Sequence, residues 1–159
     1  MTEMRAKLIA QLQPEAERAH RAISGQREKL QLEYVPGAGE DFATTLAAAQ
    51  KEDARLRQTS VGPHRDDLLF ALNGQSSAFA SEGQHRTLVL ALKLGAAHLL
   101  EQRFAAPPVL LLDDIFGELD LERRAALLAA LPATAQKIIT TTHLDWMPLD
   151  QEALQIRLG

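Results

Sequence analysis

The spacing of apolar positions predicts that the first part of the chain is mainly helical. Helical periodicity runs through residues 1–27 and again through residues 40–57. Pro14 interrupts the first of these segments, and we expect it to begin a second helix, because acidic residues follow it as they do at helix N-termini. Residues 30–35 alternate between apolar and polar and run into a Pro-Gly turn, a pattern typical of a strand.

The next part of the chain predicts a hairpin and a long helix. An apolar run at residues 68–72 is followed by Asn73-Gly74, a strong hairpin-turn signal, so that residues 76–79 are expected to form the return strand. From Ser81 onward the apolar residues recur at helical spacing. They are Leu88, Ala91, Leu92, Gly95 and Leu99.

The last part of the chain predicts a strand–helix–strand unit. Residues 109–115 are typical of a strand buried on both faces of a parallel sheet, residues 121–131 of an amphipathic helix, and residues 136–142 of a second strand. These three elements form a βαβ unit with a right-handed crossover. Residues 153–158 alternate and predict an edge strand. The expected fold class is therefore α/β, with a parallel βαβ core preceded by a mainly helical segment.

Two adjacent carboxylates, Asp113 and Asp114, stand where the apolar strand ends. Carboxylates are costly to bury unless they are paired or bind a metal, and ligands sit at strand ends in open α/β sheets. The spacing is that of a Walker B strand, in which one acid serves Mg²⁺ and the next orients the water that attacks a γ-phosphate. The structural alternative is that both acids are solvated charges at the start of the following turn.

Two further positions favour nucleotide chemistry. Ser81 and Gln84 fit a capping box, which is a sufficient structural explanation, but a helix start with a Ser and with Gly83 is also suited to binding phosphate. His143 ends the strand after the acidic one, which makes it a candidate γ-phosphate sensor. A lone His is more often structural or solvated.

A Gly-Pro turn at residues 62–63 precedes a run of ionisable side chains. His64 and Arg65 are candidates for contact with phosphate or DNA. The alternative is a solvated turn that contains an Arg–Asp pair.

Composition narrows the class of protein. The length of 159 residues suits about one domain, and the apolar fraction of 46% is sufficient for a core. The net charge of −4 argues against nucleic-acid binding by bulk charge alone, although a local basic face remains open. The absence of cysteine excludes disulfides and thiolate metal sites. No apolar run is long enough for a membrane helix, and the polar start is no signal peptide, so we expect a cytoplasmic protein without membrane contact.

The order of these motifs resembles the signature, Walker B, D-loop and switch motifs of ABC-type ATPase heads. More specifically, the chain resembles the C-terminal part of the RecF family of DNA repair and recombination proteins. The resemblance is carried by YVPG at residues 34–37, GPHRDDL at residues 62–68, SEGQHRT at residues 81–87 and LLDDIFGELD at residues 111–120. It implies a partial P-loop NTPase with an ABC/SMC-like head. Residues 1–58 would be the end of a helical arm lobe, and residues 59–159 the C-terminal portion of the head.

The resemblance also implies roles for single residues. Asp113 would serve Mg²⁺, Asp114 would polarise the attacking water and His143 would contact the γ-phosphate. The residues that would reach the nucleotide of a partner protomer, or join the two sites, are Ser81, Gly83, Gln84 and Asp120. DNA contacts are spread over a surface in this family, and the candidates here are His64, Arg65 and Arg86.

For the whole protein, the resemblance implies an ATP-dependent DNA-binding protein that dimerises head to head around nucleotide. Such proteins recognise gaps where single-stranded and duplex DNA meet, and they act with RecO and RecR in loading RecA during recombinational repair and at stalled replication. The expected cofactors are ATP and Mg²⁺.

The sequence departs from the family pattern in one respect, because no Gly-x-x-x-x-Gly-Lys-Ser/Thr occurs in these 159 residues. We therefore expect a C-terminal portion, arising by truncation, gene splitting or degeneration, that hydrolyses ATP only when a Walker A lobe completes it. Two alternatives stay open. One is a non-catalytic module that binds DNA or a recombination partner without nucleotide. The other is a Mg²⁺-dependent phosphotransfer enzyme with Asp113 as the acceptor.

Overall fold

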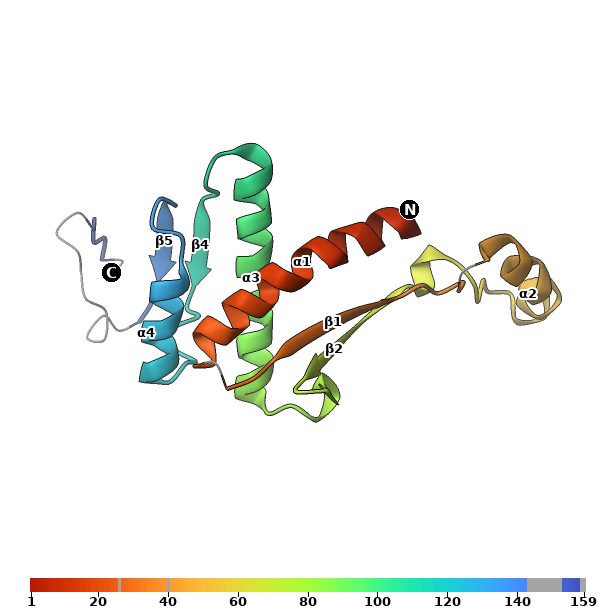
Figure 1. Cartoon of the computed structure of the whole chain (residues 1–159), viewed down its shortest axis with the longest axis horizontal. Coiled ribbons are helices and arrows are strands. Elements are labelled where there is room, and N and C mark those ends of the chain that lie inside the picture. Colours follow the sequence, from red (N-terminus) through yellow and green to blue (C-terminus); the bar gives the residue numbers. More distant parts are fainter. Residues whose placement is uncertain (26, 40, 143–152, 158–159) are drawn as a thin grey trace.

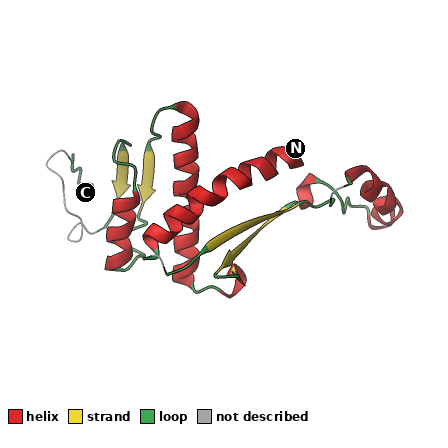
Figure 2. Ribbon diagram, in the orientation of Figure 1, coloured by secondary structure: helices red, strands yellow, loops and turns green. Residues whose placement is uncertain are grey.

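The computed structural model describes residues 1–25, 27–39, 41–142 and 153–157. Two long helices, α1 (Thr2–Ile23) and α3 (Glu82–Phe104), cross and pack against each other at the centre of the molecule (Figure 1). A parallel strand pair with helix α4 (Leu121–Ala130) lies on one side of this crossing. An antiparallel ribbon extends from the other side and carries α2 (Phe42–Leu56) at its far end (Figure 2).

Helix α1 continues through Pro14 without a break, so the expected start of a second helix at that residue is wrong. A proline inside a helix removes one hydrogen bond and costs about 3 kcal/mol. Packing overrides this cost, because Ala16, Ala19 and Ile23 are all buried beyond Pro14. At the other end of the helix, Arg5 is hydrogen-bonded to Asp66, so that both halves of α1 are held.

The ribbon consists of β1 (Leu30–Val35) and β2 (Asp67–Leu72), paired antiparallel from Leu30↔Leu72 to Val35↔Asp67. The predicted strand at residues 30–35 and the predicted Asn73-Gly74 turn are confirmed, and both turn residues have positive φ, as a tight hairpin requires. The return strand β3 is only Gln75–Ser76. Residues 77–79, expected to extend it, form the 3₁₀ helix η2, because the Ser76 hydroxyl accepts a bond from the Ala78 N–H.

The predicted βαβ unit is confirmed. Strands β4 (Leu110–Asp113) and β5 (Lys137–Thr140) are parallel, with α4 between them in the chain. The expectation that this strand is buried on both faces is wrong, because Leu110 is 9% exposed and Leu111 is 72% exposed. Successive side chains of a strand point to opposite faces, and only one face of this pair packs on the core.

Two further expectations concern the C-terminal residues and the absence of membrane helices. Residues 153–157 form no strand, so the edge strand expected at 153–158 is not seen in the described residues, and Leu158 lies outside them. None of the described helices combines the length and apolar character that crossing a bilayer requires.

The core lies where α1, α3 and the βαβ unit meet. Leucine and alanine supply most of it, and Phe116 is the largest fully buried side chain among the described residues. Buried polar side chains also lie among the packed helices, and they include Glu15, His20, Ser24 and Thr87. Glu15 is partnered by Arg18 at 2.6 Å and by the Gln102 amide at 3.2 Å.

Candidate functional site

The acidic pair, Asp113 and Asp114, lies at the carboxyl end of β4 with both side chains exposed. Asp114 has φ 47°, a left-handed conformation that Asp tolerates better than most residues. Thr140 at the end of β5 fixes both acids. Its hydroxyl donates to the Asp113 carboxylate, while the Asp114 N–H donates to the Thr140 carbonyl at 3.1 Å and approaches its hydroxyl at 3.1 Å.

Thr140 is a residue of the site that the sequence reasoning missed. The only signal for it in the sequence is its place near the end of the predicted strand at residues 136–142. His143, the candidate sensor at the end of that strand, lies outside the described residues.

The donor set at the acidic pair suits a hydrated cation rather than a protein cage. In the described part of the chain, no three His, Cys, Asp or Glu side chains are grouped to hold a metal. Mg²⁺ is usually held by one or two carboxylates together with waters and substrate phosphates. Asp113, Asp114 and the Thr140 hydroxyl supply oxygen atoms of this kind at one exposed edge. The residues present therefore fit Mg²⁺ bound together with a phosphate ligand.

The turn after the acidic pair is anchored by its apolar residues. Phe116 is fully buried and Leu119 is 5% exposed, while Glu118 between them stays exposed. Asp120 then caps helix α4, where its Oδ1 accepts from the Arg123 N–H at 2.8 Å. The Asp120 side chain thus has a structural partner besides the role that the resemblance implies for it.

The start of α3 forms the predicted capping box. The Ser81 N–H donates to Gln84 Oε1 at 2.7 Å, and the Gln84 N–H donates to Ser81 Oγ at 3.3 Å. The other end of the Gln84 amide, Nε2, donates to Glu28 Oε1 at 2.5 Å. Both side chains expected to reach nucleotide are therefore hydrogen-bonded within the chain.

Arginines connect the signature segment (residues 81–87) to the turn at residues 115–120. A Cβ at Gly83 would lie 2.7 Å from Arg123 Nη1, so glycine leaves room for that guanidinium. Arg123 also lies 3.5 Å from the Asp120 carboxylate. Arg86 donates to the Glu118 carbonyl at 3.1 Å and to Glu82 at 2.6 Å. The structure thus brings the predicted signature and D-loop residues together.

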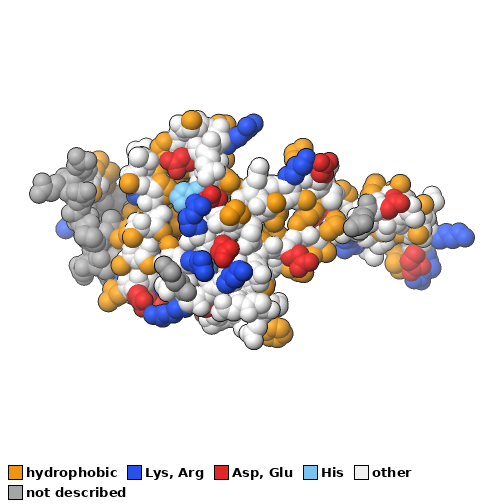
Figure 3. Space-filling view, in the orientation of Figure 1, with side chains coloured by type: hydrophobic (Ala, Val, Ile, Leu, Met, Phe, Trp, Pro, Cys, Tyr) orange, Lys and Arg blue, Asp and Glu red, His pale blue; other side chains and the backbone are white. Residues whose placement is uncertain are grey.

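The three candidates for DNA contact are not brought together. His64 and Arg65 belong to the 3₁₀ helix η1 (Pro63–Arg65), which precedes β2 in the chain. Arg86 lies in the first turns of α3, after β2, β3 and η2. Figure 1 shows that α3 lies at the other end of the ribbon from α2. Exposed His64 and Arg65 both contact the Thr59 carbonyl, at 2.9 and 3.5 Å. On the face shown in Figure 3, Lys and Arg side chains are interspersed with Asp and Glu.

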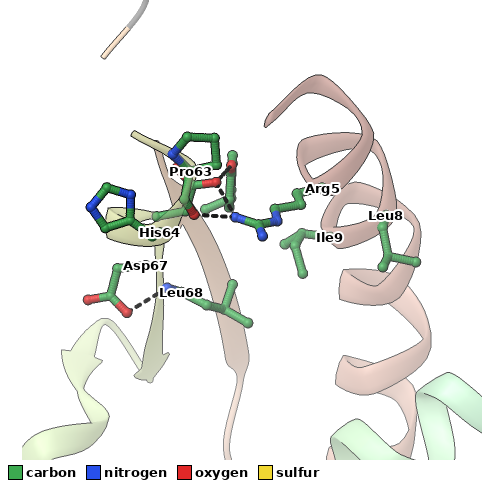
Figure 4. A pocket seen from close by; sticks show the side chains of 9 residues that line it. Arg5, Leu8, Ile9, Pro63, His64, Asp67 and Leu68 are labelled. Atoms are coloured by element: carbon green, nitrogen blue, oxygen red, sulfur yellow. Dashed lines mark hydrogen bonds and ion pairs between the residues drawn. The ribbon is translucent and has the colours of Figure 1, made fainter. Parts of the chain in front are cut away.

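Asp66, which sequence reasoning passed over, holds this end of the ribbon together. Its carboxylate accepts from the Tyr34 hydroxyl at 2.5 Å, from Arg5 at 2.6 Å and from the Gly37 N–H at 3.0 Å. Figure 4 shows Arg5 reaching from α1 toward Pro63, while the His64 ring points away from Arg5. These residues line a groove of about 540 Å³. The paired motifs at residues 34–37 and 62–68 therefore have a structural role in this chain.

We expect Asp66→Asn to lower the melting temperature at neutral pH by more than Asp67→Asn does. The bonds from Tyr34, Gly37 and Arg5 hold the pKa of Asp66 below its ordinary value of 3.8. Stability from this group is therefore present above that value and is lost as pH falls through the lower pKa of the folded state. Thermal melts across the acid range will check this.

Asp67 is the matched control, because its carboxylate is exposed and accepts from the adjacent Leu68 N–H. In Asp66→Asn, the acid-dependent loss of stability should become smaller than in the parent chain. Equal effects of the two substitutions would contradict the role given to Asp66.

The fold is that of a portion of an ABC-type ATPase head. No protein-family profile matches the chain. The chain is 41% identical to the DNA replication and repair protein RecF of Microcystis aeruginosa, over 91% of this chain and 42% of that protein. It is 45% identical to RecF of Lactobacillus delbrueckii subsp. bulgaricus, over 89% of this chain and 40% of the relative.

A solved structure described as the recombination mediator protein RecF-ATP in the RecFOR pathway matches with a TM-score of 0.74 and 32% identity. That match covers 90% of this chain and 41% of the solved one. The chain thus corresponds to a C-terminal part of RecF, and it spans less than half the length of the relatives that it matches.

Proposed function

We propose that this chain is the C-terminal portion of a RecF-type, ATP-dependent DNA-binding protein that acts in recombinational repair in the cytoplasm. The observation that carries the proposal is the acidic pair, held exposed by Thr140 at the end of a parallel strand, in a chain similar to RecF. A solved RecF–ATP structure with the same fold supports nucleotide as the ligand.

In this proposal the residues of the acidic pair have different tasks. Bound Mg²⁺ would neutralise charge on the phosphates of ATP. Asp113 would hold the ion through its water shell, with its carboxylate oriented by Thr140. Asp114 would orient the attacking water, which its exposed position at the strand end allows. His143 would contact the γ-phosphate.

The signature segment and the turn would serve the partner protomer of an ATP-dependent homodimer. Ser81, Gly83 and Gln84 would reach the partner's nucleotide, and Asp120 would join the two sites. Arg123 supports this assignment, because its Nη1 lies next to Gly83 and 3.5 Å from the Asp120 carboxylate. Residues 1–58 would form the end of an arm lobe and residues 59–159 the portion of the head.

The DNA partner would be a junction between single-stranded gap and duplex, with RecO and RecR as protein partners in loading RecA. His64 and Arg65 are exposed and suit a DNA contact. Arg86 suits it less well, because Glu82 and Glu118 already neutralise its charge at 2.6 and 3.4 Å. We retain it as the weakest of the three DNA candidates.

A second candidate function is a non-catalytic module that binds DNA or a recombination partner without nucleotide. The observation that favours it is that Ser81 and Gln84 bond to each other.

The test is calorimetric titration of Mg·ATP into the chain alone and into a mixture with the unmatched N-terminal part of the Microcystis RecF. We expect binding and hydrolysis only in the mixture. Asp114→Asn should then reduce hydrolysis by at least about 100-fold, as loss of a water-orienting acid does, and leave ATP-driven association intact.

Asp113→Asn is the informative companion variant, because it should weaken Mg·ATP binding itself. DNA binding by the chain that ignores ATP, with no binding of ATP in the mixture, would favour the module. Loss of association together with hydrolysis in Asp114→Asn would count against the role given to Asp114.

A further inference from the structure

Glu28 lies between α1 and β1 and connects a buried histidine to the signature segment. Its Oε1 accepts from Gln84 Nε2 at 2.5 Å. Its Oε2 lies 3.6 Å from His20 Nε2, too far for a hydrogen bond, and is itself buried without a hydrogen-bond partner among the described residues. The Glu28 side chain is 15% exposed and that of His20 is fully buried. This carboxylate therefore stands between the core and the start of α3.

The carboxylate of Glu28 determines which way the Gln84 amide points. An ionised carboxylate only accepts hydrogen bonds, so it selects the NH₂ end of the amide. The oxygen end of Gln84 is then left facing the Ser81 N–H, from which it accepts at 2.7 Å. With the amide reversed, NH₂ would face N–H and the reciprocal cap would be lost.

The buried ring of His20 lies next to the Glu28 carboxylate, on the side toward the core. Burial of the ring lowers the pKa of His20, an effect strengthened by Arg123 and opposed by Glu28. Neither ring nitrogen has a hydrogen-bond partner in the described part of the chain. Because the 3.6 Å between Glu28 Oε2 and His20 Nε2 is too long for a hydrogen bond, the bond to Gln84 is the contact that orients this carboxylate.

We propose that Glu28 is a positioning residue for the signature segment, because its carboxylate fixes the Gln84 amide and thereby the capped start of α3. This inference rests on the proposed function for one step, namely that the start of α3 meets the nucleotide of a partner protomer. Glu28 touches no nucleotide in this scheme. It acts through Gln84 and sets the geometry with which Ser81 and Gly83 are presented.

The first experiment measures amide hydrogen exchange by NMR in the chain itself, for the isosteric substitution Glu28→Gln. A glutamine can present NH₂ or oxygen to Gln84, so the amide orientation is no longer enforced. We expect exchange at the Ser81 and Gln84 N–H groups to become roughly 3- to 10-fold faster, the range that follows from losing a cap. Exchange elsewhere in α3 should stay within about twofold.

Two further variants make this result specific. Glu122→Gln is the matched control, because Glu122 is 71% exposed and pairs with Arg27 in the same region. The double variant Glu28→Gln with Gln84→Glu should restore slow exchange, since the carboxylate introduced at position 84 could accept from both Ser81 and the new amide at position 28. Unchanged exchange in Glu28→Gln, or faster exchange throughout the chain, would overturn the proposal, as would failure of the double variant to restore it.

The second experiment measures ATP binding and ATP-driven association in the mixture with the N-terminal part of the Microcystis RecF. Glu28→Ala should weaken ATP-driven association about 10-fold or more and leave the dissociation constant for Mg·ATP unchanged, because the signature segment serves the partner's nucleotide. Equal weakening of both would overturn the positioning role. If the parent mixture binds no ATP, the proposed function fails, and the exchange experiment still decides whether Glu28 orients Gln84.

Discussion

Replacing Phe116 with alanine will lower the free energy of unfolding by about 3–5 kcal/mol, as removal of a fully buried aromatic ring does. Phe116 is 0% exposed and is the largest fully buried side chain in the described part of the chain. Domains of this size are stable by only about 5–15 kcal/mol, so the loss is a large share of the total. Urea denaturation followed by circular dichroism will measure it.

The position of Phe116 gives this loss a second consequence. Phe116 lies two residues after Asp114 and four before Asp120. Together with Leu119 it supplies the buried side chains of this turn. Loosening this turn should therefore disturb the acidic pair and the cap of α4 together. Phe79→Ala is the control, because Phe79 is 87% exposed and its removal should change stability by less than about 0.5 kcal/mol. Equal effects of the two substitutions would refute the anchoring role.

Local patterns predicted the parts of the fold that local interactions decide. The strand at residues 30–35 has the predicted bounds, because its alternation and the Pro-Gly turn act over a few residues. The capping box at Ser81 and Gln84 is likewise a contact within one helical turn. The βαβ unit followed from a strand, a helix and a strand at the usual spacing.

Contacts between segments far apart in the sequence determine the features that local patterns did not predict, namely the continuity of α1 and the partners of the site residues. Pro14 stays within α1 because residues beyond it pack on α3, and helix propensity is too small to oppose such packing. Thr140 reaches the acidic pair across a strand pairing, and Glu28 reaches Gln84 from 56 residues away. The periodicity of one helix or strand does not indicate which residue of another segment it will contact. These two partners could therefore be identified only from the structure.

In the candidate site, too, the motifs could be predicted from the sequence and the residues that orient them could not. The order of Ser81, Asp113 and Asp120 along the chain is enough to predict an ATPase head, and the similarity to RecF agrees with that prediction. The partners that orient these residues come from outside the motifs and are Thr140, Glu28 and Arg123. Their positions depend on how α1 and the βαβ unit pack around α3. Thr140 and Arg123 belong to the βαβ unit itself, whereas Glu28 follows α1, so the crossing of α1 and α3 positions the contact to Gln84.

Gly95→Val will test that crossing and should cost about 3 kcal/mol or more, the upper range for overpacking a core. A Cβ at Gly95 would lie 2.8 Å from the Ala16 backbone nitrogen and 3.0 Å from its Cα. These are backbone atoms of the opposite helix, so no side-chain rotation can relieve the contact and the two helices must separate. Thermal and urea unfolding of the variant will measure the loss.

The matched control is Ala96→Val, one residue along α3 at an exposed position, where the same side chain should cost about 0.6 kcal/mol through helix propensity alone. Replacing Gly instead of Ala with Val gains about 0.3 kcal/mol of helix propensity, so the excess in Gly95→Val is a lower bound on the cost of separating the helices. Because α1 also carries His20 and leads to Glu28, this separation should weaken the Glu28–Gln84 bond and speed amide exchange at Ser81. Equal costs at positions 95 and 96 would mean that α1 adjusts freely, and that the start of α3 is positioned independently of the crossing.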